Sequence, residues 1–436
     1  MKGGLAKVIV LAALLVAVPA TLLMFTVRRD SVNVPYFDDY HMVPMFQAVD
    51  LHMVPIKALW TQDNENREVF PKLIMTATAY ATDWNIRSQL IVNFAIALGT
   101  AVIVCGIIFS TIKRPALRLL SVLLTAFWLF SPAQAENWLW GWENVWYVCV
   151  AAVMLAIFYM GRLGKLKAPS IYHLAVPVVF GVIASFSLAS GLLVWPIGLG
   201  MLLLQRQKRQ FLKAWLACAL VTFAAYFLHY VHPSRSPALS SFLHQPLNFV
   251  KFFLALLGRP ISDQMHGAII YGSVLLVLLI PLMYAVWRQR KNIVGLTPWL
   301  AITAFSLAAL LVTAVGRVGG GVGNSLSSRY TTLSILYMIG LIGTSSTLLD
   351  KLKLHSKYIG LALLLMATVS TPLLFSSYKN GLYASRLRHD QMLQIRTCTD
   401  EPRPTVACLQ TANFSLDTST SAAQLKYLKA RHWAGY

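Results

Sequence analysis

The stretch KVIVLAALLVAVPATLLMFTV (7–27) decides the fold, and the segment RRDSVNVPYFDD (28–39) follows it directly. The apolar run matches the roughly 20 residues that a helix needs to cross a bilayer. A signal peptide is the alternative, because two lysines precede the run. However, the run from Val8 to Phe25 is longer than a usual signal-peptide core, and two arginines follow it. We therefore expect an uncleaved first transmembrane helix.

The composition is typical of a membrane protein. Of the 436 residues, 57% are hydrophobic and 12% are charged, whereas soluble proteins carry roughly 25% charged residues. The net charge of +21 comes from short basic clusters between apolar runs. A nucleic-acid-binding domain would gather such charge on one soluble face, so we expect no nucleic-acid partner. The clusters are Lys113, Arg114 and Arg118; Arg162, Lys165 and Lys167; Arg206, Lys208, Arg209 and Lys213; Arg288, Arg290 and Lys291; and Lys351, Lys353 and Lys357.

Apolar runs of suitable length predict an all-α polytopic protein with about eleven transmembrane helices. The predicted spans are 7–27, 88–112, 115–132, 143–161, 171–189, 191–205, 212–231, 267–287, 297–316, 331–349 and 358–376. The count within 171–205 is ambiguous, because Gly191 and Pro196 permit either two short helices or one broken helix.

Alternation from a cytoplasmic amino terminus places every basic cluster in the cytoplasm, as the positive-inside rule requires. Of the 16 acidic residues, only Asp350 then lies inside. The polar chemistry is therefore expected on the outer face, in segments 28–87, 133–142, 232–266 and 317–330. We expect a transmembrane domain over 1–376 and a short extracytoplasmic tail over 377–436.

The first outer loop, 28–87, combines many acidic residues with apolar and aromatic ones, unlike a solvated disordered loop. Helical spacing of apolar residues predicts an amphipathic helix over 44–59 in the headgroup plane. A second interfacial helix is predicted over 68–82.

Asp38 and Asp39 lie about ten residues after the first span, in this loop. One of the two carboxylates could act as the general base that accepts a proton from a hydroxyl group, since neighbouring acids raise one another's pKa. Together they could bind a divalent cation, Mg²⁺ or Mn²⁺, that bridges to a phosphate. The alternative is a helix cap, because Asp is a good N-cap residue.

An acidic pair directly after the first transmembrane helix resembles the signature of the GT-C superfamily of polytopic glycosyltransferases. Three further segments look like parts of bacterial membrane proteins of that type: NENREVFPKL (64–73), SPAQAENWLWGWEN (131–144) and SSRYTTLSILYMIGLI (327–342). The resemblance spans roughly residues 30–345. It implies transfer of a sugar from a polyprenyl-phosphate carrier to an extracytoplasmic acceptor, with Asp38 or Asp39 as the catalytic carboxylate. The chain lacks the soluble carboxyl-terminal domain of larger family members, which leaves acceptor recognition open.

Polar and basic residues in the outer segments are candidates for binding the donor's phosphate and sugar. Arginine presents a planar fork that matches phosphate, and an arginine at a membrane-embedded helix mouth is costly without a partner. The alternative is an exposed loop with arginines at the headgroup level. The candidates are Glu65, Asn66, Arg67, Lys72, Arg259, Arg317, Arg329 and Tyr330.

The short outer segment around 133–142 combines tryptophans with carboxylates and amides, as carbohydrate sites do. It therefore predicts an acceptor or sugar pocket. An interfacial aromatic belt is the alternative and accounts for the tryptophans alone. The candidates are Glu136, Asn137, Trp138, Trp142 and Glu143.

Two cysteines, Cys398 and Cys408, lie in the expected outer tail. On an oxidising side of the membrane they are expected to form a disulfide.

The expected function is an integral membrane glycosyltransferase of a bacterial inner membrane, with its active site and carboxyl terminus outside. The lipid bilayer, a polyprenyl-phosphate-linked sugar and a glycan or lipid acceptor are the expected partners. A transporter or flippase for lipid-linked saccharides would need more polar groups at mid-depth in its spans. An O-antigen ligase or polymerase would carry its large loop late in the chain.

Overall fold

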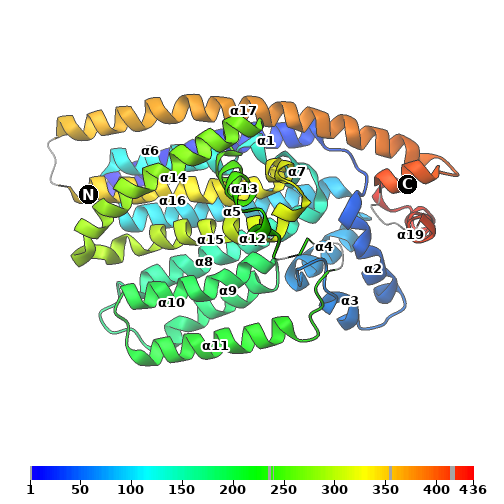
Figure 1. The fold of residues 1–436 in the computed structure, drawn as a ribbon, viewed down its shortest axis with the longest axis horizontal. Coiled ribbons are helices and arrows are strands. Elements are labelled where there is room, and N and C mark those ends of the chain that lie inside the picture. The colour runs from blue at the N-terminus through cyan, green and yellow to red at the C-terminus, as the bar shows by residue number, and fades with distance from the viewer. Residues whose placement is uncertain (1, 234–236, 239, 353–355, 413–417) are drawn as a thin grey trace.

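The computed structural model describes residues 2–233, 237–238, 240–352, 356–412 and 418–436. Within these ranges the chain is helical and has no β-strand, only an isolated antiparallel bridge between Asp63 and Asn66. Long helices run side by side, and shorter helices gather at one end of the bundle, opposite the amino terminus (Figure 1). The all-α class predicted from the sequence is confirmed.

Nine helices of the described chain are long and apolar enough to cross a membrane. These spans are Ala6–Asp30, Ile86–Thr111, Pro115–Leu139, Gly141–Leu163, Arg209–Phe227, Met265–Arg288, Thr297–Gly320, Ser328–Lys351 and Lys357–Asp400. The expected pair within 171–205 forms two shorter apolar helices, Ile171–Ser185 and Ala189–Leu204. The protein is a multi-pass membrane protein.

The helices of the bundle bury some faces against one another and leave others open to lipid. On α14, the side chains of Ile270, Val277 and Ile280 are 61%, 61% and 69% exposed, an arrangement that water would disfavour and lipid tolerates. The bundle helices are α1 (Lys2–Asp30), α5 (Ile86–Thr111), α6 (Pro115–Leu129), α8 (Asn144–Leu163), α9 (Ala175–Ser185), α10 (Val194–Leu204), α11 (Arg209–Phe227), α13 (Pro246–Gly258), α14 (Met265–Arg288), α15 (Thr297–Arg317) and α16 (Thr331–Lys351).

The first loop forms a compact helical cap at the polar end of the bundle (Figure 1). The helix expected over 68–82 is α4 (Val69–Thr82). The single helix expected over 44–59 is instead two helices, α2 (Val43–Asp50) and α3 (Ile56–Trp60), because the backbone turns at Leu51–Pro55. The 3₁₀-helix η1 (Phe37–Met42) precedes them and carries the acidic pair.

The last span continues beyond its expected end at 376. Helix α17 (Ser356–Asp400) is one helix of 45 residues, about 67 Å long and longer than a bilayer is thick. It lies along the edge of the bundle (Figure 1). A side chain at Gly381 would collide with the backbone of Pro132, so glycine permits this close contact with the 3₁₀-helix η2 (Pro132–Gln134).

The segment that follows α17 packs against the first loop, and we call it the clamp. The sequence suggested only a short tail here. Cys398 and Cys408 form a disulfide between α17 and α18 (Val406–Ala412). Helix α19 (Thr418–Ala430) and η10 (Trp433–Gly435) then return to the loop. The N–H of Ala434 donates to the carbonyl of Asp83 at 2.9 Å.

Side chains complete this clamp. The Trp433 ring meets the Phe46 and Tyr80 rings edge to face, with centroids 5.1 Å apart in both pairs. Arg431 forms an ion pair with Asp50. The clamp therefore holds α2 and α4 from outside the bundle.

Helices α13 and α14 meet through glycines, and this contact yields a testable prediction. A Cβ at Gly272 would collide with the carbonyl oxygen of Leu254, and one at Gly258 would collide with that of Ala268. We expect Gly272→Val to force the two backbones apart and to cost about 1–3 kcal/mol or more. The fraction of monodisperse protein that survives heating in detergent measures this loss. Gly99→Val is the control, because no heavy atom outside its own helix lies within 4 Å of its Cβ position, and equal losses in both variants would contradict the packing argument.

Candidate functional site

Asp39 is a buried carboxylate that shapes the backbone. Its Oδ2 accepts the N–H of Tyr36 at 3.0 Å, just before η1 begins. The residue is 1% exposed. Burial raises the pKa of Asp39 to about 7, while the backbone N–H of Tyr36 opposes that rise. Asp39 is the third residue of η1 and holds its amino-terminal end, although the N-cap residue itself is Tyr36.

Asp38 lies one residue earlier and belongs to a different environment. Its Oδ1 lies 3.9 Å from Nδ1 of His41, and the same nitrogen lies 2.9 Å from Oδ2 of Asp63. Burial, and then the charge of Asp63, raises the pKa of Asp38 to about 6. His41, Arg329 and Arg317 act in the opposite direction. Asp38 therefore has other acids and two guanidinium groups close enough to affect its pKa.

The turn after α3 supplies the other acids. Asp63 and Asn66 exchange two backbone hydrogen bonds, of 2.9 and 2.8 Å, which close a tight turn. Glu68 follows at the start of α4 and is 2% exposed, and its Oε2 lacks a hydrogen-bond partner among the described residues. Burial, and then Asp63, raises the pKa of Glu68 well above its usual value. Lys72 opposes that rise, but its ammonium group donates to the carbonyl of Thr61 at 3.0 Å.

The guanidinium groups come from the far half of the chain. Arg329 lies in η9 (Ser328–Tyr330), at the mouth of α16, with its guanidinium over the Tyr330 ring. Its Nε is buried and has no partner among the described residues. Arg317 ends α15 and forms an ion pair with Glu65, with 31% of its side chain exposed. We call Asp38, His41, Asp63, Glu68, Arg317 and Arg329 the polar cluster.

Glu136 and Asn137 hold η9 in place. The Glu136 carboxylate accepts from Ser327 and Ser328 hydroxyls and the Arg329 N–H, at 2.8, 2.9 and 3.0 Å. The Asn137 amide donates to the Arg329 carbonyl at 2.9 Å. Both residues lie on α7 (Ala135–Leu139). They therefore position Arg329, a role different from the expected sugar contact.

The tryptophans of this segment are core residues. Trp138 is 2% exposed, and its indole N–H donates to the Ser131 carbonyl at 2.9 Å. Trp142 is 4% exposed and meets His41 edge to face. Glu143 is buried beside it, in η3 (Gly141–Glu143). These rings do not present the open aromatic face that a sugar platform requires.

Arg67 is part of the scaffold. Its three guanidinium nitrogens donate to the backbone carbonyls of Tyr226, Trp60 and Leu228, the first two at 2.6 and 2.7 Å. The residue is 2% exposed. Three of its five guanidinium N–H groups are therefore taken by backbone carbonyls, so Arg67 acts as an anchor between the first loop and the end of α11.

Two further candidates, like Arg67, form hydrogen bonds with the backbone. The Asn66 side chain accepts the Ala189 N–H at 2.9 Å. Arg259 is 6% exposed and donates to the Leu326 carbonyl at 2.6 Å, which holds the 3₁₀-helix η8 (Val322–Leu326). Both therefore shape loops around the polar cluster.

The role of Arg67 can be tested by a conservative change. We expect Arg67→Lys to lower stability by roughly 1–3 kcal/mol for each carbonyl left unpaired, because a lysine cannot reach three separate acceptors. Thermal unfolding in detergent measures the change. Arg87→Lys is the matched control, since Arg87 is exposed and its guanidinium donates to the single carbonyl of Ser31. Unchanged stability with a weakened affinity for a lipid-phosphate sugar would instead favour the phosphate assignment.

Several residues near the acidic pair were not singled out from the sequence. His41 follows Asp38 at helical spacing, which was the available signal. From the sequence, Asp63 and Glu68 can be recognised only as acidic residues of the first loop. The turn that brings them near Asp38 forms only in the folded chain. Arg388 of α17 is 8% exposed, stacks on the Tyr36 ring and lowers the pKa of Asp39, but it comes from the segment expected to be a tail.

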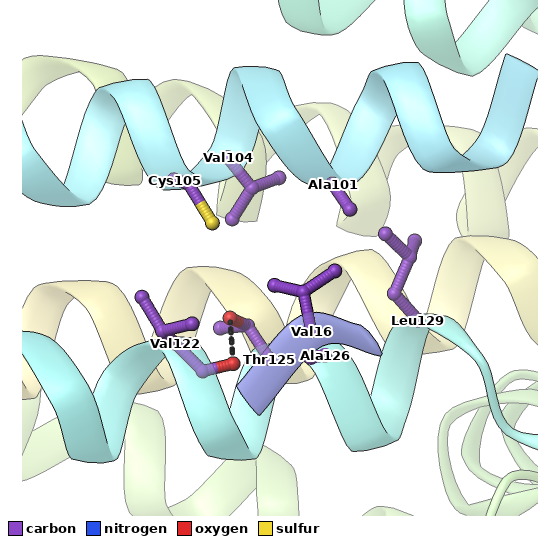
Figure 2. A pocket seen from close by; sticks show the side chains of 8 residues that line it. All are labelled: Val16, Ala101, Val104, Cys105, Val122, Thr125, Ala126 and Leu129. Carbon is purple, nitrogen blue, oxygen red and sulfur yellow. Dashed lines mark hydrogen bonds between the residues drawn. The ribbon is translucent and has the colours of Figure 1, made fainter. Parts of the chain in front are cut away.

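Two cavities of the bundle lie away from the polar cluster. One is a void of about 10 Å³ between α1, α5 and α6; Figure 2 shows side chains that line it, among them Val16, Ala101 and Val122. It is at most large enough for one water molecule. A wider apolar cleft of about 590 Å³ lies between α1 and α5, beside Ala13 and Val102. Neither is lined by a residue of the polar cluster.

The chain matches no protein-family model, and no curated protein matches it significantly in sequence. The polar cluster and the membrane fold around it are therefore the features that bear on function.

Proposed function

We propose that this protein is an integral membrane glycosyltransferase. It moves a sugar from a polyprenyl-phosphate-linked donor to a glycan or lipid acceptor outside a bacterial inner membrane. The observation that carries this proposal is the Asp38 carboxylate, which lies 3.9 Å from His41 and whose pKa is affected by Asp63 and by the guanidinium groups of Arg329 and Arg317. The likeness of the acidic pair to the GT-C signature adds support.

The chemistry of such a transfer needs a carboxylate near a bound phosphate. The acceptor hydroxyl gives its proton to Asp38, and its oxygen attacks the anomeric carbon of the donor sugar. The bond between that carbon and the phosphate oxygen breaks, and the lipid phosphate leaves with the electron pair. A single displacement inverts the configuration at the anomeric carbon.

Arg329 supports the binding of the lipid phosphate. A buried guanidinium N–H without a protein partner is costly unless an anion pairs with it. The Nε of Arg329 is such a group, and Glu136 and Asn137 fix its backbone. Arg317 is partly exposed and bound to Glu65, so a phosphate can compete for it.

The position of the cluster suits a lipid-linked donor. Asp38 belongs to η1, which connects α1 to the short helices of the first loop, and those helices lie at one end of the bundle (Figure 1). A donor anchored by its lipid could therefore present its phosphate and sugar at this end while its chain stays between helices and bilayer.

The deciding experiment uses the full chain in sealed proteoliposomes with polyprenyl-phosphate sugars and candidate acceptors. Mass spectrometry of the acceptor should reveal a new glycosidic bond, and its configuration should be inverted. Passage of a lipid-linked saccharide across the bilayer without a new glycosidic bond would overturn the proposal in favour of a transporter.

A further inference from the structure

Asp38, His41 and Asp63 bring three metal-binding groups to one point, and their ligand atoms all lie within 4.8 Å of one another. We propose that they bind a divalent cation of the Mn²⁺ type. This inference deepens the proposed function and rests on it for the cation's role, although cation binding itself can be tested alone.

The spacing of the ligand atoms fits a single ion. Oxygen and nitrogen ligands of a small divalent cation lie about 2.0–2.2 Å from it, so two of them are separated by at most about 4.4 Å. The His41 nitrogen lies 2.9 Å from the Asp63 oxygen and 3.9 Å from the Asp38 oxygen. Movements of a few tenths of an ångström in the ligand atoms would bring all three to the distances that one cation requires.

The surroundings of these groups also favour a cation. Glu68 adds a third carboxylate, buried and with an oxygen that has no partner among the described residues. After burial, the negative charges of Asp63 and Asp38 also raise the pKa of Glu68. The ammonium group of Lys72 donates a hydrogen bond to the Thr61 carbonyl. A cation at this point would pair directly with the carboxylates of Asp38 and Asp63.

The ligand types select the metal. One imidazole with two carboxylates suits Mn²⁺ or Zn²⁺ better than Mg²⁺ or Ca²⁺, which prefer oxygen ligands throughout. This ligand set differs from an Asp38–Asp39 site, because Asp39 is turned to the Tyr36 N–H. Three protein ligands leave coordination positions free for a donor phosphate oxygen. Asp38 can bind the cation with the oxygen nearer His41 and keep its second oxygen for the acceptor proton.

The test measures Mn²⁺ binding to the purified full chain in detergent, without donor or acceptor. Electron paramagnetic resonance of free Mn²⁺ should show one bound ion in the wild type. His41→Ala and Asp63→Asn should each weaken binding at least about tenfold, since each removes a ligand. His52→Ala is the matched control, an exposed histidine in the same loop, and should leave binding unchanged.

The outcomes separate the cation from the proposed transfer. No Mn²⁺ binding by the wild type, or equal binding by a correctly folded His41→Ala variant, would overturn the cation site. Metal-independent transfer that Asp38→Asn abolishes would reject the cation's role and leave the transferase standing. Site-specific Mn²⁺ binding without any transfer would support the site and reject the transferase.

Discussion

Asp38→Asn is expected to lower the rate of sugar transfer by about 10²–10⁴-fold, because an amide cannot accept the acceptor's proton. The variant should still insert into the membrane and fold. Its side chain is near-isosteric, and within the described part of the chain Asp38 accepts no backbone hydrogen bond like the one that Asp39 accepts from Tyr36. Single-turnover transfer from a polyprenyl-phosphate sugar, measured at saturating donor, checks this expectation.

Asp39→Asn separates the two acids. An amide at position 39 can keep the hydrogen bond from Tyr36 through its oxygen, but it loses the charge that faces Arg388. We therefore expect lower thermal stability and a smaller loss of transfer than in Asp38→Asn. Asp83→Asn is the matched control, since Asp83 is exposed and its left-handed backbone suits asparagine. Full activity in Asp38→Asn, or a larger loss in Asp39→Asn, would refute the assignment of Asp38.

The membrane spans could be predicted from the sequence because they depend on local properties. An apolar run of sufficient length is helical in a bilayer whatever its neighbours are. The two short helices within 171–205 were ambiguous for the same reason, since their length falls near the limit. The extension of α17 beyond 376 could not be predicted from hydropathy, because its carboxyl-terminal half is polar and is held by contacts such as that of Gly381 with Pro132.

The site was only partly predictable, since the roles of individual side chains depend on tertiary contacts. Sequence motifs drew attention to Asp38 and Arg329, and the structure places both in the polar cluster. The same reasoning favoured Arg67, which is bound by three carbonyls. The sequence cannot distinguish an arginine that binds backbone from one that awaits a ligand, because both look like a conspicuous arginine in a loop.

Arg329→Gln is expected to reduce kcat/KM for transfer by about 10²–10³-fold. It removes a charge-assisted donor from the position where phosphate charge increases as the lipid phosphate leaves. Arg329→Lys should recover part of the loss, since it restores the charge without the planar fork. Steady-state transfer with varied donor concentration gives kcat and KM for both variants.

The fold around Arg329 makes this test specific. Its backbone is held by Glu136 and Asn137, and its Nε has no partner among the described residues. Loss of the guanidinium should therefore leave η9 in place, and the melting temperature of the protein should change little. Arg87→Gln, an exposed arginine at the same end of the bundle, should transfer sugar at the wild-type rate. A purely structural Arg329 would instead show a lower melting temperature, with equal damage in the lysine and glutamine variants and an unchanged KM for the donor.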